Sequence, residues 1–248
     1  MAKSLRIFTH SIWQIFGNFG AALRLSALPY GLQIITLMLI MPMSMGMYSE
    51  QEVFPSSDQG AAFVLVIAVV VVTSLIIAVS WHRFILNNEA PRLIPKLHGS
   101  EMWRYLLRLA LITIIIVGIM VPVVALLASL LAPIGSGLMP VATMTAALAA
   151  SLVIFRLSVS LPAIAIGEQM SLREGWDSLS GQWPMLLGVG LLCVAGQFLL
   201  DLATVIFAFS PLLFIAAQVL VGWVTLMVGL SILTTLYGHY VQGRPLRQ

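Results

Sequence analysis

Charged side chains are scarce in this chain of 248 residues. Only 8% of the residues are Asp, Glu, Lys or Arg, and 60% are hydrophobic. Soluble domains average about 25% charged and roughly 45–50% apolar residues. A chain with so little charge cannot cover a surface that faces water, so we expect most of its surface to face lipid.

The sequence also lacks the residue patterns of common catalytic and metal sites. Cys193 is the single cysteine, which excludes a disulfide or a Cys-based metal site within one chain. The segments between the apolar runs contain no HExxH pattern, no Gly-rich phosphate loop and no Ser/His/Asp set. We therefore predict a protein that is not an enzyme and that needs no cofactor.

Six apolar runs, each long enough to cross a bilayer, dominate the chain. Crossing the hydrocarbon core takes about 20 residues of helix, and a segment in lipid must be helical because unpaired backbone groups are costly there. The predicted fold is therefore all-α, a polytopic membrane helix bundle that forms one integral membrane domain over 1–248. Its six transmembrane helices are predicted at 25–47, 61–81, 106–132, 137–158, 185–206 and 212–236.

Basic residues are absent from three of the five connections between these runs, around 47–60, 133–140 and 206–211. All twelve Lys and Arg residues lie on the other side of the pattern: Lys3, Arg6, Arg24, Arg83, Arg92, Lys96, Arg104, Arg108, Arg156, Arg173, Arg244 and Arg247. Because short basic loops stay cytoplasmic during insertion, we expect both termini in the cytoplasm. Charges at membrane boundaries indicate contacts with lipid headgroups, so nucleic acid is not an expected partner.

The first segment, 3–19, has the pattern of an amphipathic helix that lies in the membrane interface. Bulky apolar residues recur on one side of the helix, and polar residues recur on the other. The apolar side consists of Leu5, Phe8, Ile12, Ile15, Phe16 and Phe19, and the polar side consists of Lys3, Arg6, His10 and Gln14.

A second interfacial helix is predicted after the fourth span. Ser171 and Glu174 have the spacing of a capping box, in which each side chain bonds a free backbone N–H of the other residue. An apolar stripe of Leu172, Trp176, Leu179 and Trp183 follows. A weaker third example at 100–105 suggests three units, each an interfacial segment followed by a transmembrane hairpin: 1–81, 82–167 and 168–248.

The stretch SLPAIAIGEQMSLREGWDSLSGQWPMLLGVG (160–190) contains Pro162, which should kink or end the fourth span, and Pro184, which should begin the fifth. In this stretch, and in the order of its segments, the chain resembles the YciC-like multi-pass inner-membrane proteins of bacteria. Those proteins have an amphipathic N-terminus, six helices, a proline near the end of the fourth helix and an amphipathic segment before the fifth. The resemblance implies this topology and a bacterial inner-membrane location. It implies no chemistry, because the family has no established activity.

Two charges within predicted spans are functional candidates, since ionisable residues are rare in lipid. At 1.5 Å per residue, Arg156 lies roughly 28 Å down the fourth span and Asp201 roughly 25 Å up the fifth, so they cannot pair. We expect Arg156 to extend to lipid headgroups and Asp201 to reach the outer interface. Gln197, which shares a helix face with Asp201, should contact a neighbouring helix or, alternatively, a polar ligand.

His82 and Arg83 begin the longest basic loop and complete the candidate lipid- or ligand-binding residues. A lone histidine at an interface is interpreted here as a polar anchor in preference to a base or a ligand. A membrane enzyme acting on lipids would need acids, bases or metal ligands gathered at the basic face. The residues available for that are His82, Glu89, His98, Glu101 and Glu168.

Four methionines occupy alternate positions at the outer end of the first span: Met41, Met43, Met45 and Met47. Thioethers are soft ligands that suit Cu(I), but methionine is also a common, flexible packing residue. We expect packing and no metal site here, with a copper site as the weaker alternative.

These features predict a non-enzymatic, multi-pass protein of the bacterial inner membrane. It would act on membrane lipid organisation or as an accessory or assembly partner of a larger membrane complex. Its expected partners are membrane lipids and other integral membrane proteins. The alternative is a small-molecule or copper transporter or channel, which needs a polar path at mid-depth. The main polar residues at that depth are Thr73, Ser74, Thr113 and Gln197.

Overall fold

The computed structural model describes residues 2–45, 57–131 and 139–246. Within these ranges the chain is helical and contains no strand, so the prediction of an all-α bundle is confirmed. Six helical segments are long and apolar enough to cross a membrane, as a multi-pass membrane protein requires. The long helices are α2 (Phe19–Met45), α3 (Ser57–Asn87), α4 (Gly99–Leu131), α5 (Met139–Ser158), α8 (Trp183–Val205) and α9 (Pro211–Tyr240).

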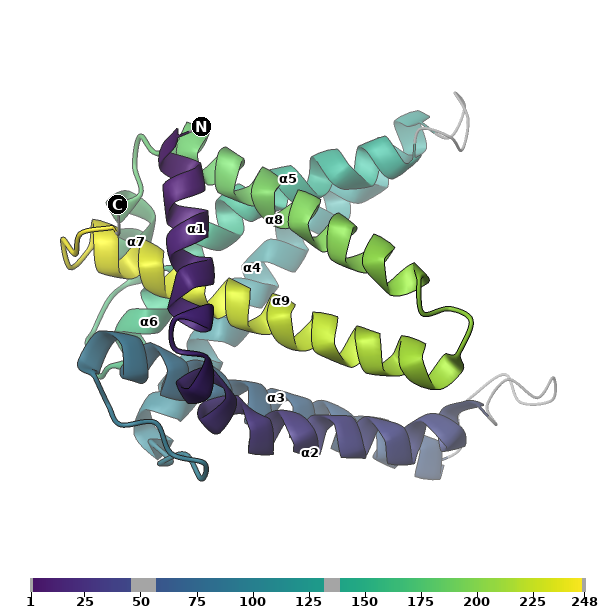
Figure 1. Ribbon diagram of the computed structural model, residues 1–248. Coiled ribbons are helices and arrows are strands. Elements are labelled where there is room, and N and C mark those ends of the chain that lie inside the picture. Colours follow the sequence, from purple (N-terminus) through teal and green to yellow (C-terminus); the bar gives the residue numbers. More distant parts are fainter. Residues whose placement is uncertain (1, 46–56, 132–138, 247–248) are drawn as a thin grey trace.

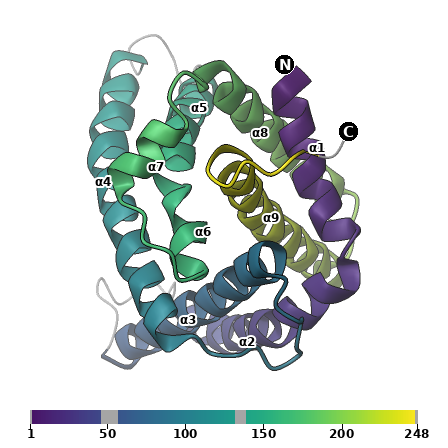
Figure 2. The same ribbon diagram turned by 90° about the vertical axis from the view of Figure 1, so that its left-hand side faces the viewer.

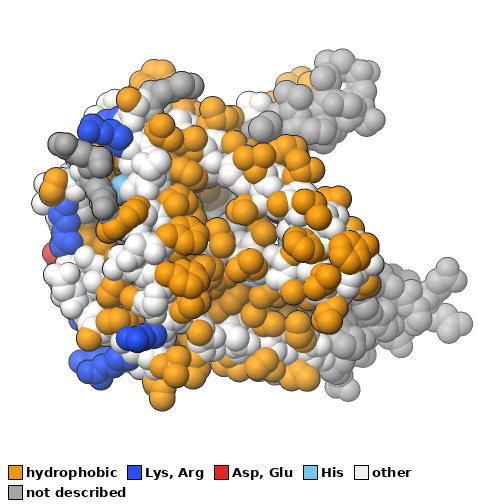
Figure 3. Space-filling model, viewed as in Figure 1, with side chains coloured by type: hydrophobic (Ala, Val, Ile, Leu, Met, Phe, Trp, Pro, Cys, Tyr) orange, Lys and Arg blue, Asp and Glu red, His pale blue; other side chains and the backbone are white. Residues whose placement is uncertain are grey.

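The long helices form three antiparallel hairpins, α2 with α3, α4 with α5, and α8 with α9 (Figure 1). Both termini lie at one end of the bundle. We call it the basic end, because Lys and Arg side chains gather there (Figure 3). Toward the opposite, remote end, the α2–α3 and α4–α5 hairpins diverge. Viewed from the basic end, the long helices surround the short α6 (Ser160–Ala165), which contacts α3, α4 and α9 (Figure 2).

The fourth crossing is interrupted close to the basic end. α5 ends at Ser158 and α6 begins at Ser160, so Pro162 stands in the first turn of α6. A proline is tolerated in a first turn because its missing N–H would have no partner there. The prediction that Pro162 kinks or ends this span is confirmed. The interruption places α6, all of whose residues are buried, in the centre of the bundle.

The N-terminal helix α1 (Ala2–Phe16) crosses α8 and α9 near the basic end (Figure 1). It is amphipathic as predicted, and Leu5 and Phe16 are exposed apolar residues. The prediction is wrong for two residues: Gln14, expected in water, and Ile15, expected in lipid, are both buried. The reason is that the helix packs on the protein, where the hydroxyl of Ser11 donates a 2.9 Å hydrogen bond to Thr235 of α9.

The predicted capping box opens the short α7 (Leu172–Ser178). The Glu174 N–H donates to Ser171 Oγ at 3.1 Å, and the Ser171 N–H donates to Glu174 Oε2 at 2.6 Å. The predicted apolar stripe is wrong at Trp183, because α7 ends at Ser178 and Trp183 is the first residue of α8. Trp183 is 61% exposed. The chain turns between the two helices at Gly181, whose φ of 72° favours glycine. Pro184 lies in the first turn of α8, as predicted.

Buried side chains concentrate in the half of the bundle near the basic end. In α9, no residue of 211–220 is buried, whereas most of 230–238 are. The remote half instead exposes large apolar side chains such as Phe63, Ile114 and Phe209, and hydrophobic surface covers much of this face of the molecule (Figure 3). Such a surface is suited to contact with lipid.

Candidate functional site

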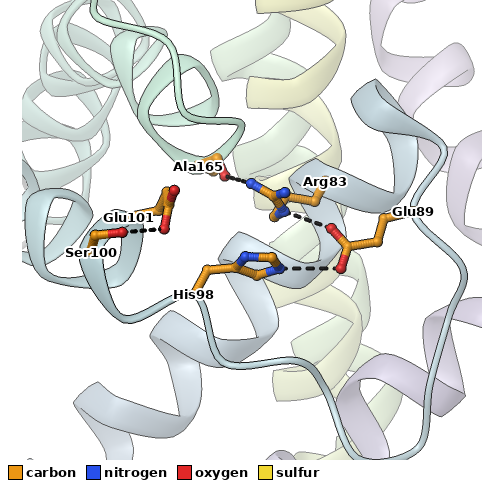
Figure 4. Close-up of polar contacts among 6 residues, drawn as sticks. All are labelled: Arg83, Glu89, His98, Ser100, Glu101 and Ala165. Carbon is orange, nitrogen blue, oxygen red and sulfur yellow. Dashed lines mark hydrogen bonds and ion pairs between the residues drawn. The ribbon is translucent and has the colours of Figure 1, made fainter.

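A polar cluster ties the loop 88–98 to the basic end of α3 (Figure 4). Arg83 Nε donates to Glu89 Oε2 at 2.6 Å, and His98 Nε2 lies 3.1 Å from the other oxygen of the same carboxylate. Arg83 Nη1 also donates to the backbone carbonyl of Ala165 in α6, at 3.1 Å. The predicted ligand-binding residue Arg83 therefore joins α3, the loop and α6 to one another.

Glu89 is ionised at neutral pH. Burial by itself would raise the pKa of this carboxyl, but hydrogen bonds from Arg83 and His98 outweigh burial and lower the pKa below its ordinary value. Glu101 lies nearby but bonds Ser100 at 2.7 Å (Figure 4). Among the described residues, no three His, Cys, Asp or Glu side chains are grouped so that they could hold a metal ion. The cluster is suited to a structural role, in which it holds the loop 88–98 against α3 and α6.

His82, predicted at the interface, is fully buried. Its Nδ1 lies 2.8 Å from Thr234 Oγ1 of α9, and its Nε2 lies 3.4 Å from the hydroxyl of Tyr105 in α4. The prediction of an exposed polar anchor is wrong, because α3 does not end at Trp81 but continues to Asn87, and His82 faces the interior of the bundle. The imidazole of α3 thus contacts side chains of α4 and α9, and it has no exposed surface that a lipid could contact.

Arg156, predicted to extend to lipid headgroups, has partners within the protein that the prediction did not include. Its Nε and Nη2 donate to the backbone carbonyl of Trp176 at 3.1 and 2.9 Å. The guanidinium also lies 4.0 Å from the centre of the Trp176 ring. These partners are available because α7 folds back onto α5 and places a carbonyl and an aromatic ring beside Arg156. Arg156 attaches α7 to the bundle, and it makes no ion pair with Asp201 in the described part of the chain.

Gln197 contacts a neighbouring helix, as predicted. The hydroxyl of Thr225 in α9 donates to Gln197 Oε1 at 2.7 Å, and Gln197 Nε2 donates to Asp201 Oδ1 at 2.9 Å. We call the first of these bonds, between Thr225 and Gln197, the α8–α9 bridge. It joins the two helices at mid-depth, on a surface that is otherwise apolar.

A groove of about 510 Å³ lies between α1, α8 and α9, and we call it the α1 groove. α8 and α9 are apart where α1 crosses them (Figure 1), and the α8–α9 bridge lines the groove. Apart from Gln197, Thr225 and the thiol of Cys193, its lining side chains are apolar. The α1 residues among them, Phe8, Ile12 and Phe16, belong to the face predicted to contact lipid, and Gly196 and Gly229 line the groove from α8 and α9.

The polar residues predicted at mid-depth do not share one path. Gln33 of α2 donates to Thr73 Oγ1 at 2.7 Å and to Ser74 Oγ at 2.9 Å, which joins α2 to α3. Thr113 donates to the carbonyl of Leu109 in its own helix at 2.9 Å. Gln197 lines the α1 groove. These polar residues therefore lie in three separate parts of the bundle.

The copper alternative concerns residues outside the described part of the chain. The side chains of Met41, Met43 and Met45 are not described, and neither is any part of Met47. The copper site therefore stays a hypothesis.

The sequence did not predict several hydrogen bonds between segments that are far apart in the chain. The Trp81 indole donates to Ser231 Oγ at 3.0 Å, the Trp223 indole donates to Ser26 Oγ at 2.8 Å, and the Tyr237 hydroxyl donates to Glu168. For the two tryptophan bonds, the sequence does show a serine within an apolar helix, and a hydroxyl group in lipid needs a hydrogen-bonding partner. The sequence does not show which tryptophan that partner is.

In comparisons with known proteins, no family model, no curated protein and no solved structure matches this chain.

Proposed function

We propose that this chain is a non-enzymatic protein of the bacterial inner membrane that binds a phospholipid acyl chain in the α1 groove. In this role it would serve membrane lipid organisation, by itself or as an accessory partner of a larger membrane complex. The basic end would face the cytoplasm, because all twelve Lys and Arg residues belong to that side of the sequence pattern. The resemblance of 160–190 to YciC-like proteins supports the same location.

The α1 groove is the observation that carries the proposal. Its volume of about 510 Å³ lies within the range of roughly 300–1,000 Å³ typical of small-molecule sites. Phe16 and Leu199 on its rim are more than half exposed, so the groove opens on the apolar surface that faces lipid. A hydrocarbon chain is the ligand that suits these walls, since it needs no hydrogen-bonding partner.

α1 itself closes the basic end of the groove and is held there from both sides. Its Ser4 touches the backbone of α8 at Gly188, where an added Cβ would overlap with Ser4 Oγ. Its Ser11 bonds Thr235 of α9. The groove therefore has a fixed boundary and is not a chance gap at the bundle surface. A transport function finds less support, because the predicted mid-depth polar residues Thr73, Ser74, Thr113 and Gln197 bond within separate helices or helix pairs and share no path among the described residues.

A groove-filling substitution tests the proposal. A Cβ at Gly229 would meet no described atom within 4 Å, so Gly229→Leu should fit without a clash and occupy the groove. Gly31→Leu on α2, which is equally open and lies outside the groove, is the matched control. After purification in mild detergent, native mass spectrometry should show one more retained phospholipid on the wild type and on the control than on Gly229→Leu. Equal retention by all three proteins would reject the proposal.

A further inference from the structure

A second cavity, of about 600 Å³, lies at the basic end between the start of α4, α6 and the segment that leads into α7. It is on the opposite side of the bundle from α1 (Figure 2). Two arginines, Arg104 and Arg108, line one wall, and Glu174 lines the cavity as well. Leu107 and Leu111 extend the lining along α4. The cavity thus combines both signs of charge with an apolar strip.

The two arginines have unused hydrogen-bonding capacity. Arg104 and Arg108 are four residues apart on α4, a spacing at which like charges repel on a helix. Arg108 Nη1 donates to the Met170 carbonyl at 2.9 Å. Arg104 makes no hydrogen bond or ion pair with the described residues. Each guanidinium carries five N–H donors, so an anion placed between them would relieve the repulsion and accept several bonds.

Glu174 supplies the opposite charge. One oxygen of its carboxylate accepts the capping bond from Ser171 at 2.6 Å, and the other makes no hydrogen bond within the described structure. The bond from the Ser171 backbone lowers the pKa of Glu174, so the group is ionised at neutral pH. The cavity therefore offers two cations and one anion to a ligand.

The depth of the cavity matches the headgroup layer of a bilayer. The 33 residues of α4 rise about 50 Å, whereas the hydrocarbon core is about 30 Å thick. This excess length allows the first turns of α4, with both arginines, to extend beyond the hydrocarbon at the basic end. Trp103, which is 60% exposed, stands beside them as interfacial tryptophans do. Leu107 and Leu111 lie further along the helix, in the direction of the hydrocarbon.

We propose that this cavity binds the headgroup of a phospholipid that carries an amine beside its phosphate, such as phosphatidylethanolamine. The phosphate lies between Arg104 and Arg108, the ammonium faces Glu174, and the acyl chains follow Leu107 and Leu111. A lipid with an uncharged headgroup beyond its phosphate would leave Glu174 unpaired. This site is separate from the α1 groove, and either could exist without the other.

The test measures lipid binding by the full-length chain in detergent, with phosphatidylethanolamine and phosphatidylglycerol titrated in parallel by native mass spectrometry. The wild type should prefer phosphatidylethanolamine. Arg104→Gln should weaken both lipids about fivefold, the factor for one basic residue near a lipid phosphate. Glu174→Gln should weaken phosphatidylethanolamine alone and abolish the preference. Glutamine keeps the capping box, and Arg104 bonds no described residue, so neither change should disturb folding.

Asp177→Asn is the matched control, because this exposed carboxylate lies on the same helix, pairs with Arg173 and does not line the cavity. It should leave both affinities unchanged. Soluble phosphoethanolamine, which has the headgroup and no chains, distinguishes a lipid from a soluble ligand, and it should bind far more weakly than the lipid. A preference for phosphatidylglycerol, tighter binding of both lipids by Glu174→Gln, or phosphoethanolamine binding as tight as lipid would each overturn the proposal. Loss of the retained acyl chain in Gly229→Leu has no bearing on this outcome.

Discussion

α3 shows, within a single helix, how different the two halves of the bundle are. Over 60–72 none of its residues is buried, although nearly all are apolar. Over 73–86 it contains fully buried side chains, and these include the polar His82 and the indole of Trp81. The half with more polar residues is thus the half with the tighter packing.

The contrast follows from the solvent. Lipid tails are as apolar as leucine, so burying a leucine against another helix gains little, and helices associate through close packing and hydrogen bonds instead. The basic half is held by bonds such as Trp81 to Ser231 and Ser11 to Thr235. The remote half has few such bonds among its described residues. The arrangement of the helices is therefore specified mainly at the basic end, and substitutions there should have the larger effects.

The largest difference is expected between two glycine-to-leucine substitutions. At Gly190 of α8 an added Cβ would overlap with Ser151 Oγ and lie 3.0 Å from Ser151 Cβ of α5. At Gly118, on α4, it would meet no described atom within 4 Å. Gly190→Leu should destabilise the fold by about 1–3 kcal/mol or more through overpacking, whereas Gly118→Leu should be nearly neutral. Thermal unfolding in detergent measures both, and similar melting temperatures would show that the two halves are equally packed.

A smaller but clear loss is expected for Arg156→Met. The substitution keeps most of the side-chain length and removes both hydrogen bonds to Trp176 and the contact with its ring. Hydrogen bonds to charged groups contribute about 1.5–3 kcal/mol, so the free energy of unfolding should fall by about 2 kcal/mol. Arg173→Met is the control, since the side chain of Arg173 is 92% exposed. Its effect should stay within about 0.5 kcal/mol, and an equal loss in both variants would contradict the role of Arg156.

The smallest expected effect concerns pH. The pKa of Glu89 is lower in the folded chain than in the unfolded chain, so its contribution to stability is present above the unfolded value of about 4.3 and is lost as pH falls through the folded value. Because the cluster is partly exposed, the contribution should be at most about 1 kcal/mol. Unfolding of the wild type and of Glu89→Gln should be compared between pH 7 and pH 3. The variant should be less stable at pH 7, and the difference should vanish in acid. A constant difference would mean that the Glu89 carboxylate is not the group responsible.

The features that the sequence predicted correctly are those encoded locally. The six spans follow from runs of apolar residues, the start of α7 from Ser171 and Glu174, and the interruption of the fourth crossing from Pro162. Each depends on residues within a few turns of one another.

The features that the sequence did not predict depend on residues far apart in the chain. The placement of Arg156 depends on where α7 folds back, and the burial of His82 depends on Thr234, which is 152 residues away. A helical wheel for α1 separates apolar from polar residues, but it cannot show that a second helix covers Gln14. The two candidate lipid sites are likewise made by segments that meet only in the folded chain.

The crossing of α1 over α8 and α9 also affects how the protein is made. Ser11 bonds Thr235, a residue 224 positions later. Synthesis proceeds at about 5–20 residues per second, so on the order of 10–45 s pass between the synthesis of Ser11 and that of Thr235. Until α8 and α9 have been synthesised, α1 lacks the two helices on which it packs, and its apolar face is suited to the membrane surface. The amphipathic sequence of α1 is thus compatible with two surroundings, the membrane surface before α9 is made and the surface of α8 and α9 afterwards.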